Sequence, residues 1–473
     1  MAPSKTTTLS PIDQLMPKTY TRIFLVLKTL DHLKAVDSLS AGLAALATRL
    51  PYLRGRISST PAVDGSRLVI TWSEADDAPL RLSEIPPAAD TPSLDEIERT
   101  DAALHHFTDG LAPVRVLPAE TAAPVFAASY TPIAGGLILC YCVHHAAMDG
   151  AGVADLAGLW AACTRGEVDS VVADADEPLR RLERLQEGVA ATAERGESGP
   201  PLSFSDLMAR HPQYRLLSTS AAPNPPAPPP PASTSHIFRF SAAKLSHLRA
   251  ALAGASGSSR DGLTLNNLLG ALLWSCVTRV RLARRGAAVR PSSSRLGFAV
   301  DGRRHLGSGF APCRFLGNVN MYAVADAAVP VLETASTLAS DQWVPEAASA
   351  LAEVAGRIAA AAARVTAASV GEVLALVGRA PDVADLAPGW RSFHGTDLTM
   401  TSWANQGLYG VDFGGAAGGR PQFVRVPLAQ FDGLCIVLPR RRDGEGEKIE
   451  VVCFLARDDL AALKGDEVWM TWF

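Results

Sequence analysis

Short apolar runs in the first third of the chain predict strands. Residues 20–27 and residues 137–143 are rich in Ile, Phe, Leu, Val and Cys, and each run has the length of a buried strand. Residues 68–72 predict a third strand, which follows an Asp64-Gly65 turn.

Apolar side chains that recur every three or four positions predict helices between and after these strands. Such positions within residues 36–50 fall on one face of a helix that Pro51 ends. A second, shorter helix is expected over residues 153–160. Strands that alternate with helices predict an α/β or α+β domain, which we place at residues 1–170.

The composition changes after this domain. Residues 171–235 are first charged and then rich in proline, with seven prolines in the nine residues from Pro223 to Pro231. Proline lacks a backbone N–H, so this stretch is expected to be extended polyproline within an exposed crossover. A ligand for proline-recognising modules is the alternative interpretation.

The alternating pattern resumes at His236 and predicts a second domain over residues 236–473. The expected strands are residues 236–240, 296–300 and 449–455, and the expected helices are residues 265–280, 345–379 and 458–463. No sequence repeat relates the two halves, so the expected similarity is one of architecture.

Composition narrows the class of protein. The chain has 473 residues, 48% of them hydrophobic, which is enough to bury cores and excludes a disordered chain. At this length, roughly two to four domains are expected. Lys and Arg number 44 and Asp and Glu 48, and this near balance excludes a broadly basic nucleic-acid binder.

Cysteine usage and the absence of long apolar runs predict a soluble, cytoplasmic protein. The seven cysteines are scattered and form no CxxC pair, which indicates reduced thiols without a disulfide framework or a metal site. Residues 1–14 lack the apolar core of a secretory signal, and no apolar run is long enough to span a bilayer.

The segment CYCVHHAAMDGAG, residues 140–152, combines residues that can carry catalysis. A histidine at the end of a buried strand, such as His145, can face a cleft and accept a proton near neutral pH. Asp149 can fold back to orient the imidazole, or it can pair with a distant cation. Gly150 lets the chain turn into the next helix. A structural histidine pair followed by a helix-capping aspartate would give the same pattern.

His105 and Asp109 repeat the His-x-x-x-Asp spacing, so the spacing alone does not identify a site. No apolar strand leads to His105, and Pro113 follows shortly after. We therefore expect these two residues at the surface or in supporting structure.

Residues 399–426 offer a second candidate segment. Thr401, Ser402 and Trp403 place two hydroxyl groups and an indole N–H close together, and such donors can stabilise a developing oxyanion. The glycine-rich run after Asp412 lacks the Lys-Ser/Thr of a phosphate-binding loop, so a structural loop is the simpler interpretation.

HHAAMDG and SWANQGLYGVDFGG together resemble the BAHD acyltransferase family, in particular the fungal secondary-metabolism branch similar to trichothecene 3-O-acetyltransferase. LSPIDQLMP near the start, VDGRRHL at residues 300–306 and LGNVN at residues 316–320 resemble further family segments. The resemblance implies an α/β (α+β two-layer) fold of two chloramphenicol-acetyltransferase-like domains, each a mixed β-sheet with flanking helices. It also implies a channel between the domains.

The resemblance implies roles for individual residues. His145 matches the catalytic base, and Asp149 matches the motif's aspartate, which in the family pairs with an arginine that falls at Arg303. Thr401 and Trp403 match positions that support the tetrahedral intermediate or place the acceptor. Structural support is expected of the remaining candidates, His144, Gly150, Asp412, Phe413 and Gly414.

The implied activity transfers an acetyl or other short acyl group from acyl-CoA to a hydroxyl or amine of a small secondary metabolite. His145 acts as general base in a ternary complex without an acyl-enzyme. The partners are acyl-CoA and the acceptor, with no permanently bound cofactor, and the family expectation is a monomer. Two alternatives are a condensation-type enzyme with a carrier-protein-bound donor and a catalytically inactive binding relative.

One departure from the family concerns its DFGWG segment, which reads DFGGAAGG from Asp412 and lacks the tryptophan. A loop that only supports the domain interface would leave activity intact, whereas a loop on the CoA side would alter donor choice. Arg440 to Arg442 are cations that could meet CoA phosphates, but an exposed hairpin beside Asp443-Gly444 is the simpler interpretation.

Overall fold

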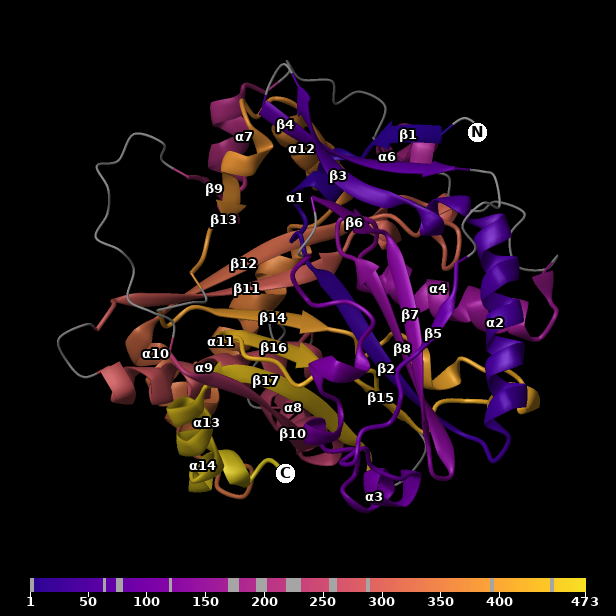
Figure 1. Cartoon of the computed structure of the whole chain (residues 1–473). Helices are drawn as coiled ribbons and strands as arrows, with labels where there is room; N and C mark the ends of the chain where they lie inside the picture. The colour runs from indigo at the N-terminus through magenta and orange to yellow at the C-terminus, as the bar shows by residue number, and fades with distance from the viewer. Residues whose placement is uncertain are drawn as a thin grey trace.

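The computed structural model describes residues 4–62, 65–73, 80–118, 121–168, 178–192, 202–217, 231–254, 262–285, 290–391, 395–442 and 446–473. Two mixed β-sheets organise these residues (Figure 1). The five-stranded sheet has the order β15 (Phe423–Arg425), β2 (Tyr20–Lys28), β8 (Gly136–His144), β7 (Phe126–Ile133) and β5 (Leu82–Glu84). The six-stranded sheet has the order β10 (Ser233–Ser241), β17 (Lys448–Ala456), β16 (Leu434–Val437), β14 (Leu398–Ser402), β11 (Ser293–Asp301) and β12 (Asn320–Ala328).

The position of strand β8 at the centre of its sheet explains why its sequence is almost entirely apolar. All nine residues of β8 are buried, because both of its edges are paired and both of its faces are covered. On one face it contacts the core that contains Leu139 and Tyr141, and on the other the core that contains Cys140 and Cys142. The predicted strand over residues 137–143 is therefore confirmed.

The strand β15 comes from the last quarter of the chain but completes the five-stranded sheet. It pairs antiparallel with β2, with Val424 opposite Leu25, and Figure 1 places it beside the strands of the N-terminal part. The predicted boundaries 1–170, 171–235 and 236–473 remain a prediction, and the sheet shows that the third segment crosses over to the first.

Helices cover the sheets. In the N-terminal part, α2 (His32–Arg49) packs against α4 (Gly150–Thr164), and Trp160 of α4 donates a hydrogen bond of 2.9 Å to the Leu39 carbonyl. In the C-terminal part, α9 (Leu265–Arg285) contacts α10 (Val329–Ala335), α11 (Pro345–Ala363) and α13 (Arg457–Lys464). The predicted helices at residues 36–50, 153–160, 265–280 and 458–463 are confirmed.

Smaller elements surround the two large sheets. A four-stranded sheet contains β1 (Ser4–Thr8), β4 (Gly65–Ser73), β3 (Arg56–Ala62) and β6 (Ala122–Pro124), and a two-stranded sheet contains β9 (Tyr214–Leu216) and β13 (Leu386–Pro388). The remaining α-helices are α1 (Pro11–Leu15), α3 (Leu94–Arg99), α6 (Arg181–Thr192), α7 (Phe204–Arg210), α8 (Ala242–Gly254), α12 (Ala367–Gly378) and α14 (Glu467–Met470).

Two expectations need correction. The helix expected over residues 345–379 is divided into α11 and α12, since Thr366 caps the start of α12 through its side chain. The crossover over residues 171–235 is not uniformly exposed, because α6 and α7 lie within it and Arg181 and Leu185 are buried. Charged composition concealed the buried face of α6. The Asp64-Gly65 turn at Asp64 and the proline-rich stretch before Pro231 lie outside the described residues.

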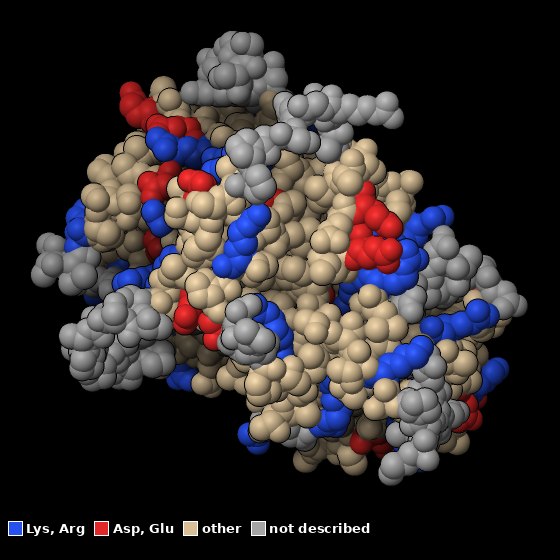
Figure 2. Space-filling model, turned by 90° about the horizontal axis from the view of Figure 1, so that it is seen from above, with Lys and Arg blue, Asp and Glu red and all other residues tan. Residues whose placement is uncertain are grey.

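Among the described residues, no single helix has the length and apolar character needed to cross a membrane. Of the described helices, the pair α11 and α12 together has this length and apolar character, but the two helices are bent by 71° where they meet. On the face seen in Figure 2, basic and acidic side chains occur in small mixed groups. This distribution accords with the near balance of 44 basic and 48 acidic residues.

Candidate active site

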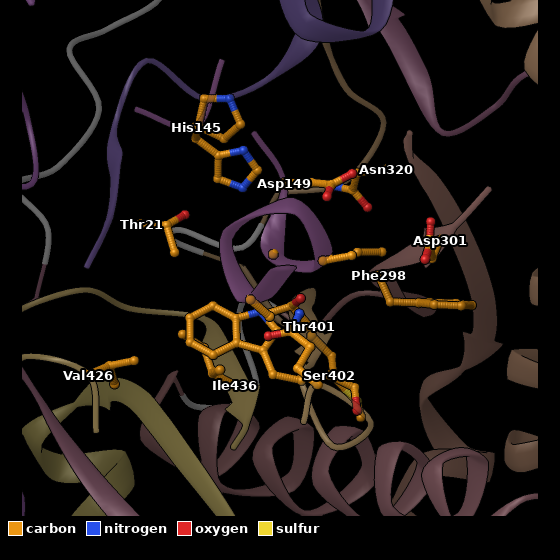
Figure 3. A pocket seen from close by; sticks show the side chains of 18 of the residues that line it. Thr21, His145, Asp149, Phe298, Asp301, Asn320, Thr401, Ser402, Val426 and Ile436 are labelled. Atoms are coloured by element: carbon orange, nitrogen blue, oxygen red, sulfur yellow. The ribbon is translucent and has the colours of Figure 1, made fainter. Parts of the chain in front are cut away.

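A cavity of about 1270 Å³ lies between the two large sheets. Thr21 of β2 lines one side of it, Phe298 of β11 lines the other, and Thr401 of β14 faces it from the six-stranded sheet (Figure 3). His145 and Asp149 reach it from the turn that joins β8 to α4. The cavity is therefore built from residues that are far apart in the chain, such as Thr21 and Thr401, which are 380 positions apart.

His145 is delivered to the cavity by the end of β8. The strand ends at His144, and the His145 backbone N–H donates 2.8 Å to the Thr19 carbonyl, which turns the chain out of the sheet. The ring then projects between the Thr21 side and the Phe298 side (Figure 3). The sequence prediction that this histidine faces a cleft is confirmed.

The surroundings of His145 favour the neutral imidazole. Burial lowers its pKa, and hydrogen bonding by its own backbone, the charge of Asp149 and the Asn318 side chain act in the opposite direction. These hydrogen-bonding contacts are long, because the buried Nδ1 atom has no described partner within 3.5 Å and in good alignment. A neutral imidazole can take a proton from a ligand in the cavity.

Asp149 pairs with Arg303, as the family resemblance implies. The guanidinium group donates two hydrogen bonds to the carboxylate, of 2.8 and 2.9 Å, and the backbone N–H groups of Gly152 and Val319 donate 3.0 and 2.8 Å. Burial would raise the pKa of Asp149, but Arg303 and these donors together hold the pKa below its usual value. Asp149 is also the N-cap of α4, so it fixes the turn that carries His145.

Two glycines let the start of α4 dock against the C-terminal half. A Cβ atom on Gly152 would lie 2.0 Å from the Leu316 carbonyl oxygen, and one on Gly150 would lie 2.9 Å from Nε1 of Trp403. A side chain at Gly152 would clash with the Leu316 backbone, and one at Gly150 would press on the side chains of Gln406 and Trp403. The role of Gly150 is therefore close approach between segments, in addition to the turn that the sequence predicts.

His144 faces away from the cavity. Its ring packs edge-on against Tyr20 with centroids 5.3 Å apart, and its Nδ1 accepts a hydrogen bond of 3.2 Å from the Ala146 backbone. Burial, with the charges of His145 and Lys18, lowers the pKa of His144 to about 4. This placement fits the predicted supporting role.

Thr401, Ser402 and Trp403 all line the cavity opposite His145 (Figure 3 labels the first two). Among the described residues, neither the Thr401 hydroxyl group nor the Trp403 indole N–H has a hydrogen-bond partner. Both donors are thus open to a ligand. The strand β14 and the Trp403 backbone N–H, which donates 2.8 Å to the Val437 carbonyl, hold this segment in the sheet.

Comparison with known proteins identifies the family. The model of the Transferase family matches residues 1–469. The chain belongs to this family, the BAHD acyltransferases. It is 37% identical to trichothecene 8-O-acetyltransferase of Fusarium sporotrichioides over 99% of this chain and 98% of that protein. It is 26% identical to trichothecene 3-O-acetyltransferase TRI101 of the same fungus over 95% and 92% of the two chains.

Solved structures share the fold. TRI101 of F. graminearum complexed with coenzyme A and T-2 mycotoxin has a TM-score of 0.76 and 19% identity, with 99% of both chains covered. Vinorine synthase has a TM-score of 0.57 and 19% identity, with 97% of this chain and 91% of that chain covered. The α/β fold of two chloramphenicol-acetyltransferase-like domains that the resemblance implies agrees with these neighbours, and the protein is an acyltransferase.

The segment from Asp412 to Gly414 lies outside the cavity lining of the acyltransferase, although Val411 contributes to it. The Phe413 ring packs edge-on against Trp160 of α4 at 5.8 Å, and Gly414 has a positive φ of 83°. These contacts favour the first of the two alternatives for this loop, which is support of the interface between the halves.

His105 is exposed and does not line the cavity, as expected. Asp109 makes a contact that its spacing from His105 does not indicate. Its carboxylate lies 2.8 Å from Nη1 of Arg22, a buried residue of β2 that lines the cavity. Sequence reasoning missed Arg22, because a single arginine within an apolar strand carries no motif.

An aromatic wall at one side of the cavity also escaped prediction. Phe298, Tyr322 and Trp390 line it, and the ring of Trp390 stands edge-on to Tyr322 at 5.5 Å. Trp390 donates 2.8 Å to the Thr399 hydroxyl and lies directly on Gly297, where a Cβ atom would be 1.9 Å from the ring. Only the pairing of distant segments brings these residues together.

The arginines after β16 have partners on the protein. Arg440 makes two hydrogen bonds to Glu447, Arg441 lies over the Tyr409 ring, and Arg442 donates 2.6 Å to Asn405, which lines the cavity. The predicted turn at Asp443-Gly444 lies outside the described residues. Within the described part of the chain, no group of three His, Cys, Asp or Glu side chains is placed to hold a metal.

Proposed function

We propose that this protein transfers an acetyl or other short acyl group from acyl-CoA to a hydroxyl group of a trichothecene-like secondary metabolite, with His145 as general base. The observation that carries the proposal is the position of the neutral His145 ring in the cavity, on a turn that the Asp149–Arg303 pair fixes.

The size of the cavity supports two substrates. Pockets for a single small ligand have volumes of about 300–1,000 Å³, and the cavity of about 1270 Å³ exceeds this range. The pantetheine arm of acyl-CoA and an acceptor can therefore meet at His145. The acyl-CoA donor is further supported by the coenzyme A named in the complexes of TRI101.

The proposed reaction is a direct transfer. Nε2 of His145 takes the proton of the acceptor hydroxyl, and the oxygen attacks the thioester carbonyl carbon. The resulting oxyanion accepts hydrogen bonds from Thr401 and Trp403. The C–S bond then breaks, the ester is released, and the CoA thiolate recovers the proton from His145. The balance is one ester and one CoA thiol for each thioester and alcohol.

The acceptor class is proposed from the relatives and from the cavity. The names of two relatives specify trichothecene hydroxyl groups as the positions that those enzymes acetylate. The wall of Phe298, Tyr322 and Trp390 suits a rigid apolar skeleton, and Asp301 and Asn320 beside it can bind hydroxyl groups. The monomeric state and the cytoplasmic location remain predictions.

The test is a transfer assay with a matched pair of histidine variants. The purified protein is mixed with acetyl-CoA and a trichothecene that has a free C-8 hydroxyl group, and thiol release and acetylated product are measured. His145→Ala is expected to lower kcat by about 10²–10⁴-fold, the usual contribution of a general base. It is expected to fold normally, because the hydrogen bonds that residue 145 makes through its backbone, to Thr19 and from Asn318, remain in the variant. His105→Ala, at an exposed position, is expected to behave as wild type.

The same assay separates the alternatives. Transfer from an acyl-carrier protein but not from acetyl-CoA would favour a condensation-type donor. Binding of CoA without any transfer would favour an inactive relative. A His145→Ala variant with the wild-type rate would refute the proposed role of this histidine.

A further inference from the structure

Two buried polar residues lie behind His145 and have no part in the reaction as proposed so far. Asp13 belongs to α1, and Asn318 lies in the loop before β12. Both are completely buried, with 0% of their surface exposed. Buried polar groups are costly unless they are satisfied, so their arrangement requires an explanation.

Asp13 accepts hydrogen bonds from two segments. Its Oδ2 atom accepts 3.1 Å from the Ser10 backbone, and its Oδ1 atom accepts 3.0 Å from the Asn318 backbone and 2.7 Å from Asn318 Nδ2. Nη1 of Arg181 lies 3.9 Å from Oδ2. Burial raises the pKa of Asp13, and Arg181 and the hydrogen bonds from Asn318 and Ser10 oppose this rise. The carboxyl group therefore holds Asn318 from both its backbone and its side chain.

The side-chain amide of Asn318 has one possible orientation. Its Nδ2 atom also donates 3.0 Å to the backbone carbonyl of His145, and a carbonyl oxygen can only accept. With its NH₂ group between Asp13 and this carbonyl, the amide must turn its Oδ1 atom the other way. This Oδ1 atom is buried and has no partner among the described residues, and the same holds for Nδ1 of His145.

The Asp149 carboxylate is not available to orient the imidazole. Both of its oxygens are engaged by Arg303, and each also accepts a backbone N–H, from Gly152 or from Val319. Of the two roles that the sequence leaves open for Asp149, the structure favours pairing with a distant cation. Besides the backbone of His145 itself, the group that acts on the His145 ring through a hydrogen bond is the Asn318 side chain.

We propose that Asn318 is the positioning residue of His145: its Oδ1 atom accepts the Nδ1 proton of the imidazole, and Asp13 fixes the amide in the orientation that allows this. The proposal rests on the proposed function, in which Nε2 of His145 is the base. With the proton held on Nδ1, the lone pair of Nε2 faces the cavity. The hydrogen bond shortens as the imidazolium forms, since such contacts are often long before the substrate binds.

Other charged and titratable groups near Asn318 and His145 must also be considered in the test. Asp149, from the same turn, acts on the pKa of His145 through its charge, and Arg303 and Arg22 line the same cavity. Arg181 of α6 faces Asp13. A substitution at Asn318 leaves Asp149, Arg303, Arg22 and Arg181 in the chain and removes one hydrogen bond from Asp13.

The variant that isolates the amide is Asn318→Ala. It removes the link between Asp13 and His145 but keeps the Asn318 backbone N–H that Asp13 accepts. It also removes a buried oxygen that has no partner. The control is Asn267→Ala, which removes a buried asparagine that accepts hydrogen bonds from Thr264 at the start of α9, outside the cavity.

The first measurement is independent of activity. Nitrogen-15 NMR of histidine side chains, with His145 assigned through His145→Gln, reports the tautomer and the pKa of the ring. In wild type we expect the proton on Nδ1. In Asn318→Ala we expect a mixture of tautomers and a lower pKa, because an acceptor that favours the protonated ring is lost. A wild-type proton on Nε2 would overturn the proposal, even if the transfer reaction itself were absent.

The second measurement is kinetic. We expect kcat of Asn318→Ala to fall by about 10²-fold, the effect of a misplaced reacting group, with KM for acetyl-CoA within about twofold of wild type. The acid limb of the pH profile of kcat/KM moves to lower pH. Asp13→Asn is expected to move it in the same direction, and if this variant does not fold, Asn318→Ala decides alone. An unchanged acid limb, or equal losses in Asn318→Ala and Asn267→Ala, would show a merely structural amide and overturn the proposal.

Discussion

Replacement of Arg303 by alanine tests whether the ion pair beside His145 is a structural element. The guanidinium group makes five hydrogen bonds, to Asp149 twice, to Asp301, and to the carbonyls of Phe315 and Gly317. Its side chain is only 6% exposed, as is that of Asp149. Arg303→Ala therefore leaves a buried carboxylate and two buried carbonyl groups without their donor.

The expected cost follows from this burial. Removing one partner of a buried pair costs about 3–5 kcal/mol, whereas the whole stability of a domain is about 5–15 kcal/mol. We expect urea unfolding to give a free energy of unfolding lower by about 3–5 kcal/mol, and transfer activity to fall with it because the His145 turn loses its anchor. The pKa of Asp149 rises when its main positive neighbour is gone, so the deficit in stability becomes smaller at low pH.

Arg180→Ala is the matched control. Arg180 pairs with Glu183 on the surface, where the two side chains are 53% and 58% exposed. Exposed pairs contribute about 0–1 kcal/mol, so this variant should unfold close to wild type. If Arg303→Ala unfolded at the same urea concentration as Arg180→Ala, the Asp149–Arg303 pair would not be structural, and our account of the turn would be wrong.

Three further substitutions test other parts of the structure. Gly297→Ala places a Cβ atom 1.9 Å from the Trp390 ring, so we expect a loss of about 1–3 kcal/mol and altered acceptor KM, whereas Gly356→Ala, with open space around it, should not destabilise α11. Acidification from pH 6.5 to 4 is expected to cost about 3 kcal/mol at His144, because the unfolded chain binds the proton that the folded ring, with its pKa of about 4, excludes. This contribution to stability is thus retained above pH 6.5 and lost as the pH falls. His144→Gln should flatten the pH dependence of the free energy of unfolding in urea. An unaltered pH dependence would contradict the assignment to His144. Phe413→Ala should lower the melting temperature, because it removes about 3–5 kcal/mol from the free energy of unfolding, but it should leave kcat of the folded enzyme unchanged. A changed KM for acyl-CoA would instead place the loop of Phe413 on the donor side of the cavity.

The main elements of the fold were predictable from local pattern. The strand over residues 137–143 is apolar because it is central and buried on both faces, and the helix over residues 36–50 shows its core-facing stripe every three or four positions. The break between α11 and α12 was missed, since an alanine-rich stretch gives no strong signal for its end. The pairing of β15 with the N-terminal sheet was missed, because a strand of only three residues, Phe423 to Arg425, does not indicate which sheet it completes.

The candidate site was predictable only in part. A strand that ends just before His145 and a turn that ends in Asp149 form one local motif, so the sequence located both residues and the structure places both at the cavity. His105 and Asp109 have the same spacing without the strand, and they lie outside the cavity lining. Arg22 lines the cavity from within β2 and pairs with Asp109, a contact between two segments that local pattern cannot join.

The sequence by itself determined the period of each long element, the motif that carries His145 and the family to which the chain belongs. Only the tertiary structure decided which polar groups meet. Asp13 and Asn318 are 305 positions apart, and Trp390 rests on a glycine 93 positions before it, at Gly297. Periodicity is a property of neighbouring residues and is therefore written in the chain. Hydrogen-bond partners of a buried group are set by how the two sheets pack, because a buried donor or acceptor binds whatever the packing places within about 3 Å of it.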